Sequence, residues 1–182
     1  MAGTNATIKA LRKLLSTAAV APEEMAKHAQ ELFGRNDRLI AIVVGSAVEA
    51  SLQGLLVARM PKGSGDLFAF KGALSTFSAK IAVAYAFGLI DSDVRRNADY
   101  IRDIRNVFAH RIAPTSFRTP EVAAACKILT LGYMERRTTS KTLMRTRYLY
   151  AAMDTGTAIA RARLSDDGRP ASLHEKHPPQ RR

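Results

Sequence analysis

Cysteine is nearly absent from this chain of 182 residues, since Cys126 is the only one. One cysteine excludes an intramolecular disulfide and a thiolate metal cluster. Cys126 follows a run of alanines and precedes Ile128 by two positions, so we expect a buried structural thiol. A protein without disulfides is expected in a reducing compartment, and we expect a cytoplasmic location.

Motifs for cofactors and metals are missing as well. The glycines that follow Lys62 do not complete a phosphate-loop motif, and no strand is expected before them. His174 and His177 stand three positions apart, but their surroundings are polar, basic and rich in proline, which does not favour a metal site. The sequence therefore predicts no metal and no cofactor.

A leader and a membrane span are also not expected. Residues 1–12 lack the apolar core of a signal peptide. The longest apolar stretch, 39–60, contains Glu49, Gln53 and Arg59 among several small residues. A helix that is apolar around most of its circumference but carries such residues is typical of a buried helix in a bundle. We therefore expect no membrane contact.

Acidic residues are scarce relative to basic ones, since 28 Lys and Arg face 16 Asp and Glu for a formal net charge of +12. A positive field attracts nucleic acid or an acidic protein. The charge is densest where five cations accompany the single acid Glu135: Arg136, Arg137, Lys141, Arg145 and Arg147. If one helix runs through this segment, Arg137, Lys141 and Arg145 share a face. This segment is either a nucleic-acid-binding or acidic-partner patch or a solvated basic face.

The scarcity of aromatic residues and the abundance of alanine favour packed helices over a sheet. Helical spacing and capping residues predict helices over 4–16, 22–33, 38–60, 75–87, 91–110, 119–134 and 142–164. We expect an all-α, single-domain helical bundle of about six to seven helices over 1–164. Residues 165–182 are polar, basic and Pro-rich and are predicted to form a disordered tail.

The stretch from Tyr100 to His110 is the most informative part of the sequence. Its apolar residues share one helix face, and on another face Arg102, Asn106 and His110 follow one another at intervals of four, with Asp103 beside them. Arg105 lies five positions before His110, which is about 140° around an ideal helix. The two side chains could converge if the last turn loosens, or across the interface of a homodimer.

These residues carry a resemblance to a known family. Arg105-Asn106-x-Phe108-Ala109-His110 resembles the Arg-polar-x-x-x-His motif of HEPN-type helical domains. Together with the segment 72–81 and the segment 84–90, it resembles the mannitol operon repressor family, an all-helical branch of that fold. The resemblance covers roughly 39–130, within a core that we place at 36–132. It implies an all-helical, dimeric regulator in the transcriptional control of sugar-alcohol uptake.

The resemblance leaves two functions open. As a non-enzymatic regulator, the protein would contact nucleic acid or a protein through a basic face, although no helix-turn-helix is evident. As a metal-independent HEPN-type ribonuclease, it would use His110 as general base or acid and Arg105 to stabilise the phosphorane, with Asn106 orienting one of them. Alternatively, these residues form a structural hydrogen-bond cluster with an acid.

Two charged residues in apolar helices bear on that choice. Glu49 needs a partner if it is buried, and Arg105 and Arg102 are the candidates, unless it lies at an exposed helix margin. Lys80 lies in the largely apolar helix 75–87, where we expect its stem to pack on apolar surface. Lys80 also falls within the segment that resembles the repressor family.

Overall fold

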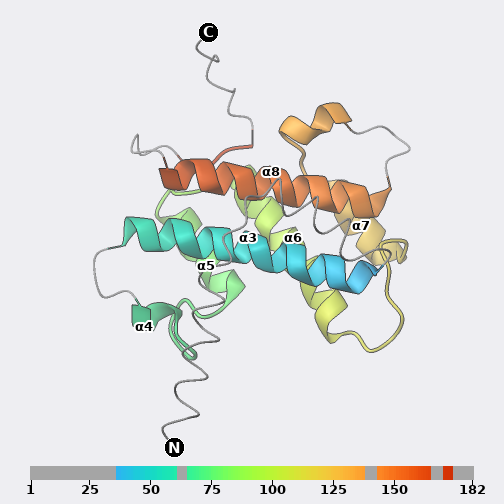
Figure 1. Ribbon diagram of the computed structural model, residues 1–182, viewed down its shortest axis with the longest axis horizontal. Helices are drawn as coiled ribbons and strands as arrows, with labels where there is room; N and C mark the ends of the chain where they lie inside the picture. The colour runs from blue at the N-terminus through green and yellow to red at the C-terminus, as the bar shows by residue number, and fades with distance from the viewer. Residues whose placement is uncertain (1–35, 61–64, 138–142, 165–169, 174–182) are drawn as a thin grey trace, which may run out of the picture.

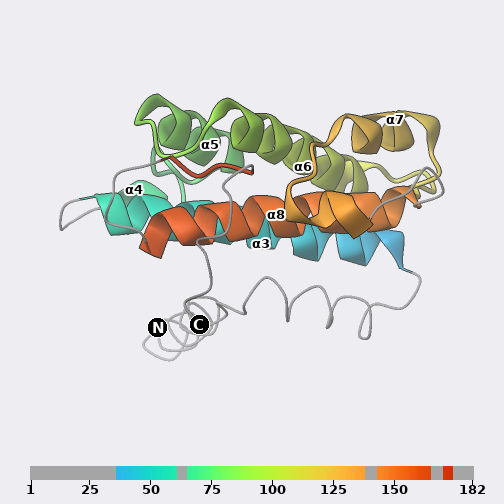
Figure 2. The ribbon, with the colours of Figure 1, turned by 90° about the horizontal axis from the view of Figure 1, so that it is seen from above.

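The computed structural model describes residues 36–60, 65–137, 143–164 and 170–173. Two layers of helices make up the bundle (Figures 1 and 2). One layer contains α3 (Asp37–Arg59) and α8 (Met144–Leu164), which lie side by side and run in the same direction. The second layer contains α5 (Phe77–Ala86), α6 (Ser92–His110) and α7 (Pro120–Ile128). Two short elements, α4 (Gly65–Phe68) and the 3-10 helix η1 (Tyr133–Arg137), connect them. The all-α bundle predicted from sequence is confirmed.

Helix α3 is the core of the bundle, because α5, α6 and α8 all pack against it. It is the helix, among those described, that is apolar and long enough to cross a membrane, but one side of it packs against the other helices. One side is fully buried: Ile40, Ala41, Val44, Val48, Leu52, Leu55 and Leu56. The buried central helix expected from the sequence is thus the one that positions the others.

Local capping residues set the starts of the long helices. Asn36 accepts a hydrogen bond from the backbone N–H of Leu39 at the start of α3, and Asp91 accepts from the first turn of α6. Asn36 was one of two caps considered for α3, and Asp91 was expected to open α6. Asn and Asp satisfy N–H groups that lack a partner in the first turn. Gly88, predicted to end the helix 75–87, has a φ of 64°, a left-handed conformation that glycine adopts without strain.

Three boundaries differ from the prediction. The N-cap of α5 is Thr76 rather than Ser75, and its hydroxyl accepts from Ala79 N–H. Thr119 does precede α7, but its side chain accepts from the backbone of Ser116 instead of the helix. Helix α7 ends at Ile128 rather than near Met134, since the chain then turns back to contact α6 and α8.

The tail also differs from the prediction in part. Ala171 and Leu173 are buried, and Ala171 pairs with Ile90 in an isolated parallel bridge. They pack because they are apolar residues within a polar segment, and the Ala171 N–H donates to the carbonyl of Leu89. Residues 170–173 therefore belong to the bundle rather than to a disordered tail. The predicted helices 4–16 and 22–33, and both His174 and His177, lie outside the described residues.

Candidate functional site

A cluster of three charged side chains joins α3, α5 and α6. Glu49 accepts a hydrogen bond from Lys80 Nζ at 2.7 Å through one carboxylate oxygen and from Arg105 Nη2 at 2.6 Å through the other. Arg105 also donates to the side-chain oxygen of Asn106. Only 16% of the Glu49 side chain and 6% of the Lys80 side chain remain exposed. We call Glu49, Lys80 and Arg105 the interior ionic cluster.

The backbone of α3 makes room for this cluster at Gly45. A Cβ at that position would lie 2.9 Å from the Cβ of Arg105, closer than such atoms normally approach. The missing side chain lets α6 approach α3 closely enough for Arg105 to reach Glu49, one turn further along. Phe77 of α5 lies 5.9 Å from the guanidinium carbon. The cluster is therefore enclosed by the three helices that it links.

This cluster decides between the alternatives left open for Glu49. The prediction that Glu49 pairs with an arginine is confirmed for Arg105, and Arg102 is not its partner. Lys80, for which packing of the stem on apolar surface was expected, is buried as an ion pair instead. Removing one partner from such a cluster leaves a charge without compensation, which is costly in the interior. The arrangement is thus suited to holding three helices in register.

The outer face of α6 carries a second, exposed network. Arg102 donates to Asp99 and Asp103, Arg96 to Asp93, and Arg95 lies at 3.9 Å from Asp99. An open cleft of about 490 Å³ follows this face, lined by Tyr85, Ser92, Arg95, Arg96, Asp99, Tyr100 and Asp103. We call it the balanced face, because each of its three arginines has a carboxylate partner.

His110 lies apart from the interior ionic cluster. Helix α6 remains regular through its last turn, as the hydrogen bond from Arg111 N–H to the Val107 carbonyl shows. The last turn does not loosen, so His110 lies about 140° around the helix from Arg105. The His110 side chain is exposed, whereas Arg105 is largely enclosed. Within one chain, the two residues of the motif therefore do not form a single site.

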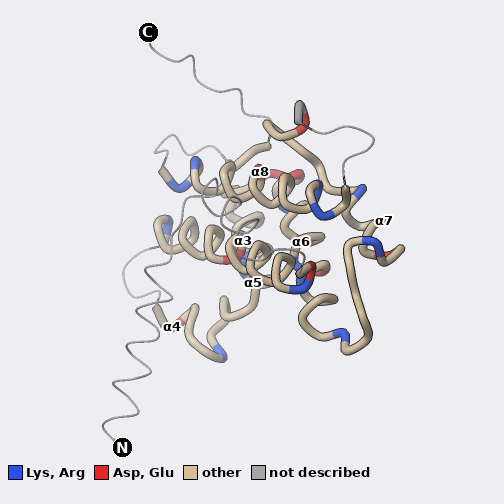
Figure 3. The backbone as a smooth tube through the Cα atoms, turned by 45° about the vertical axis from the view of Figure 1, so that its right-hand side comes forward, with Lys and Arg blue, Asp and Glu red and all other residues tan. Residues whose placement is uncertain are grey.

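His110 instead lies at an end of the bundle that is rich in arginine. Arg38, at the start of α3, donates to the backbone carbonyl of Arg111 at 2.7 Å, and Arg118 follows in the same loop. All three arginines are exposed, and within the described residues none forms an ion pair with a carboxylate. We call Arg38, His110, Arg111 and Arg118 the basic end. Figure 3 shows Lys and Arg at this end of the molecule, where α7 lies and α8 begins.

The acids near the basic end do not neutralise it. Asp37 is engaged by Arg145, at 2.9 Å from its Nε, and by the backbone N–H of Phe117. The other acid, Glu121, lies in the first turn of α7. Arg38, Arg111 and Arg118 form no ion pair with either of these carboxylates within the described residues. The local charge is positive, in contrast to the balanced face.

The basic segment predicted over 136–147 is divided between elements. Arg137 ends η1 and Arg145 lies in α8, which begins at Met144, so no continuous helix gives them a common face. Lys141 lies outside the described residues. Arg145 forms the ion pair with Asp37, and Arg147 donates to the carbonyls of Cys126 and Leu129 at the end of α7. These two arginines hold α8 against its neighbours, because the last carbonyls of a helix lack partners. Arg136, like Arg137, belongs to η1.

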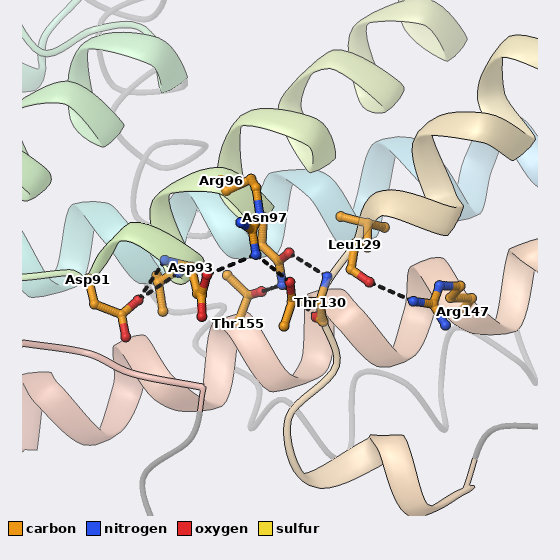
Figure 4. A network of polar contacts seen from close by, with 9 residues as sticks. Asp91, Asp93, Arg96, Asn97, Leu129, Thr130, Arg147 and Thr155 are labelled. Carbon is orange, nitrogen blue, oxygen red and sulfur yellow. Dashed lines mark hydrogen bonds and ion pairs between the residues drawn. The ribbon is translucent and has the colours of Figure 1, made fainter.

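Two buried polar residues were not singled out from the sequence. Asn97 of α6 is fully buried; it donates to the Thr130 carbonyl and the Thr155 hydroxyl and accepts from the Thr130 N–H, as Figure 4 shows. Asp154 of α8 accepts from Gly132 and Met134 N–H. The sequence did contain a signal for both residues, because each is a polar residue at a position of its helix where the spacing calls for an apolar one.

The ionisation of two groups reflects burial. Burial raises the pKa of Asp154 above its ordinary value, and the two backbone N–H donors act in the opposite direction. Burial likewise raises the pKa of the Cys126 thiol to about 12, with the charge of Arg147 acting against it. Cys126 is therefore a protonated, buried thiol, as predicted.

The fold and the site together define an all-α helical bundle with an interior ionic cluster, a balanced face and a basic end. Comparison with known proteins adds no family to this description. No protein-family model matches the chain, and no curated protein and no solved structure shows a significant match to it.

Proposed function

We propose that this protein is a non-enzymatic, cytoplasmic regulator, similar to the mannitol operon repressors, that contacts nucleic acid through the basic end. The proposal rests on one observation, which is that the arginines of the basic end and those of the balanced face differ in their ion pairing. Arg111 and Arg118 have no carboxylate partner among the described residues, whereas the arginines of the balanced face each have one. Exposed, unpaired arginines are available to phosphates, which accept charge-assisted hydrogen bonds from guanidinium groups.

Contacts of this kind predict a particular mode of binding. No recognition helix lies at the basic end within the part of the chain that the structure describes, so its arginines would contact the phosphate backbone rather than base edges. Such binding is weakly sequence-specific and falls steeply with salt, because each neutralised phosphate releases counterions. A regulator of this type would gain its specificity from a second copy of the chain or from a partner protein.

The test measures the affinity for a labelled duplex DNA at several salt concentrations by fluorescence anisotropy. Arg111→Ala combined with Arg118→Ala should reduce the slope of log K against log[salt] by about 1.8, or 0.9 for each phosphate contact. The matched control replaces two arginines of the balanced face, Arg95 and Arg96, with alanine and should leave the slope unchanged. An equal loss in both variants, or no salt-dependent binding by the wild type, would contradict the proposal.

Arg105 supports the non-enzymatic proposal over the ribonuclease. A catalytic arginine must be free to stabilise charge on the phosphorane. Arg105 is held by Glu49 at 2.6 Å, and 23% of its side chain is exposed. A carboxylate at this distance would repel a phosphate from the same guanidinium. The position of Arg105 therefore favours a structural role.

His110 is the observation that keeps the ribonuclease as a second candidate. It is exposed beside Arg111, so an RNA backbone bound at the basic end would pass close to its imidazole. In a homodimer, Arg105 of one copy and His110 of the other could meet. The test is cleavage of a labelled RNA pool in EDTA by the wild type and by His110→Ala. Metal-independent cleavage that disappears in the variant would establish the ribonuclease and overturn the regulator.

A further inference from the structure

The loop after α6 exposes an apolar tip in the middle of the basic end. Ile112 is 99% exposed, the highest value among the large apolar side chains described, and its neighbours Ala113 and Pro114 are exposed as well. A side chain in that position contributes no burial to the fold. Single exposed apolar residues are common on protein surfaces, but this one lies beside Arg111 and five residues before Phe117, which anchors the loop.

The loop that carries this tip is held in place on both sides. Arg38 donates to the Arg111 carbonyl, and Asp37 accepts from Phe117 N–H at 3.0 Å. The ring of Phe117 packs at 5.0 Å from Phe108 and at 5.2 Å from Tyr148. The loop therefore holds Ile112 outward from a fixed base. A side chain presented in this way loses little conformational freedom when it binds a partner.

The chemistry around the tip distinguishes among partners. Burying one isoleucine contributes about 1.5–3 kcal/mol, which is too little for a membrane anchor, since even a myristoyl chain binds only marginally. An apolar wedge between two base steps needs only one such side chain, and isoleucine and proline both serve in this role. Arg111 and Arg118 of the same loop are exposed cations that would contact the phosphates flanking an opened step.

We propose that Ile112 is a wedge that enters the minor groove of duplex DNA and kinks it, while Arg111 and Arg118 hold the flanking phosphates. This inference rests on the proposed function and gives it a substrate class, which is deformable double-stranded DNA. Pyrimidine–purine steps unstack most easily. A duplex with a central TA step should therefore bind more tightly than a stiff A-tract of the same length.

The experiment uses the full-length protein and two labelled duplexes. End-to-end energy transfer reports bending, and 2-aminopurine beside the TA step reports unstacking through increased fluorescence. Ile112→Ala should abolish both signals and weaken binding about tenfold, equivalent to about 1.4 kcal/mol, while the salt slope stays that of the wild type. The matched control is Leu164→Ala, since Leu164 is 86% exposed at the end of α8 and should have no effect.

The failure of the wedge can be told apart from the failure of the proposed function. Salt-dependent binding without a bend, or an Ile112→Ala variant that bends DNA like the wild type, overturns the wedge and leaves the regulator in place. No salt-dependent binding to any duplex overturns both. If Ile112→Ala instead reduces sedimentation with anionic phosphatidylserine vesicles and leaves DNA binding unchanged, the tip contacts membranes and the wedge is wrong.

Discussion

Arg105 of the interior ionic cluster lies in α6 and Arg111 of the basic end caps the same helix, yet the two arginines have opposite surroundings. Arg105 is enclosed and paired with Glu49, so its charge serves the packing of α6 on α3 and α5. Arg111, six positions later, is exposed and has no carboxylate partner among the described residues. The difference shows that the role of an arginine in such a motif is not fixed by its position in a helix. The role depends on the residues that the fold places beside it.

The largest expected effect comes from breaking the interior ionic cluster. Glu49→Ala leaves Lys80 and Arg105 as enclosed cations without an acid, and it should lower the free energy of unfolding by about 3–5 kcal/mol. Urea denaturation followed by circular dichroism measures this loss. The matched control is Asp103→Ala on the balanced face, whose carboxylate is 61% exposed. It should cost less than about 1 kcal/mol, and equal losses would show that the cluster has no special role in the fold.

A smaller effect tests the close approach that lets Arg105 reach Glu49. Gly45→Ala would place a Cβ at 2.9 Å from the Cβ of Arg105, which cannot move without α6. We expect a net loss of about 1–2 kcal/mol, although alanine favours helices, because crowding in a packed interior costs about 1–3 kcal/mol. At Gly54 the nearest atom belongs to the flexible guanidinium of Arg163. Gly54→Ala should therefore be neutral or stabilising, and urea denaturation of both variants measures the difference.

The smallest effect on stability is expected at the basic end. Arg111→Ala removes an exposed side chain without an ion-pair partner and should change the free energy of unfolding by less than about 0.5 kcal/mol. The same variant should weaken DNA binding at low salt. Together the two measurements sharpen the comparison, because Arg105 should matter for stability and Arg111 for binding. A large loss of stability in Arg111→Ala would contradict this division.

Much of the fold could be predicted from local sequence signals. The predicted limits of α6 agree with the structure to within one residue, because Asp91 caps its start and the chain approaches Pro114 after its end. The starts of α3 and α7 were similarly marked by Asn36 and Pro120. The end of α7 could not be predicted in this way. It depends on Asn97 and Asp154, which bind the backbone after the helix from distant parts of the sequence.

The candidate site was predicted only in part. The sequence identified Glu49, Lys80 and Arg105 as charged residues in need of an explanation, and the pairing of Glu49 with Arg105 was one of three alternatives. The sequence could not show that Lys80 shares the same carboxylate, which lies 31 positions away along the chain. The basic segment misled the prediction, because Arg145 and Arg147 are engaged by Asp37 and by the end of α7.

The sequence by itself determined the helical class, the approximate starts of the long helices and the composition of charge, because helix spacing and capping act within one or two turns. Only the tertiary structure decided which charges are neutralised and which remain available. Ion pairs such as Glu49 with Arg105 join residues 56 positions apart, and they form only where packed helices bring them within hydrogen-bonding distance. The exposure of Ile112 has the same origin, since it depends on where Arg38 and Asp37 hold the loop.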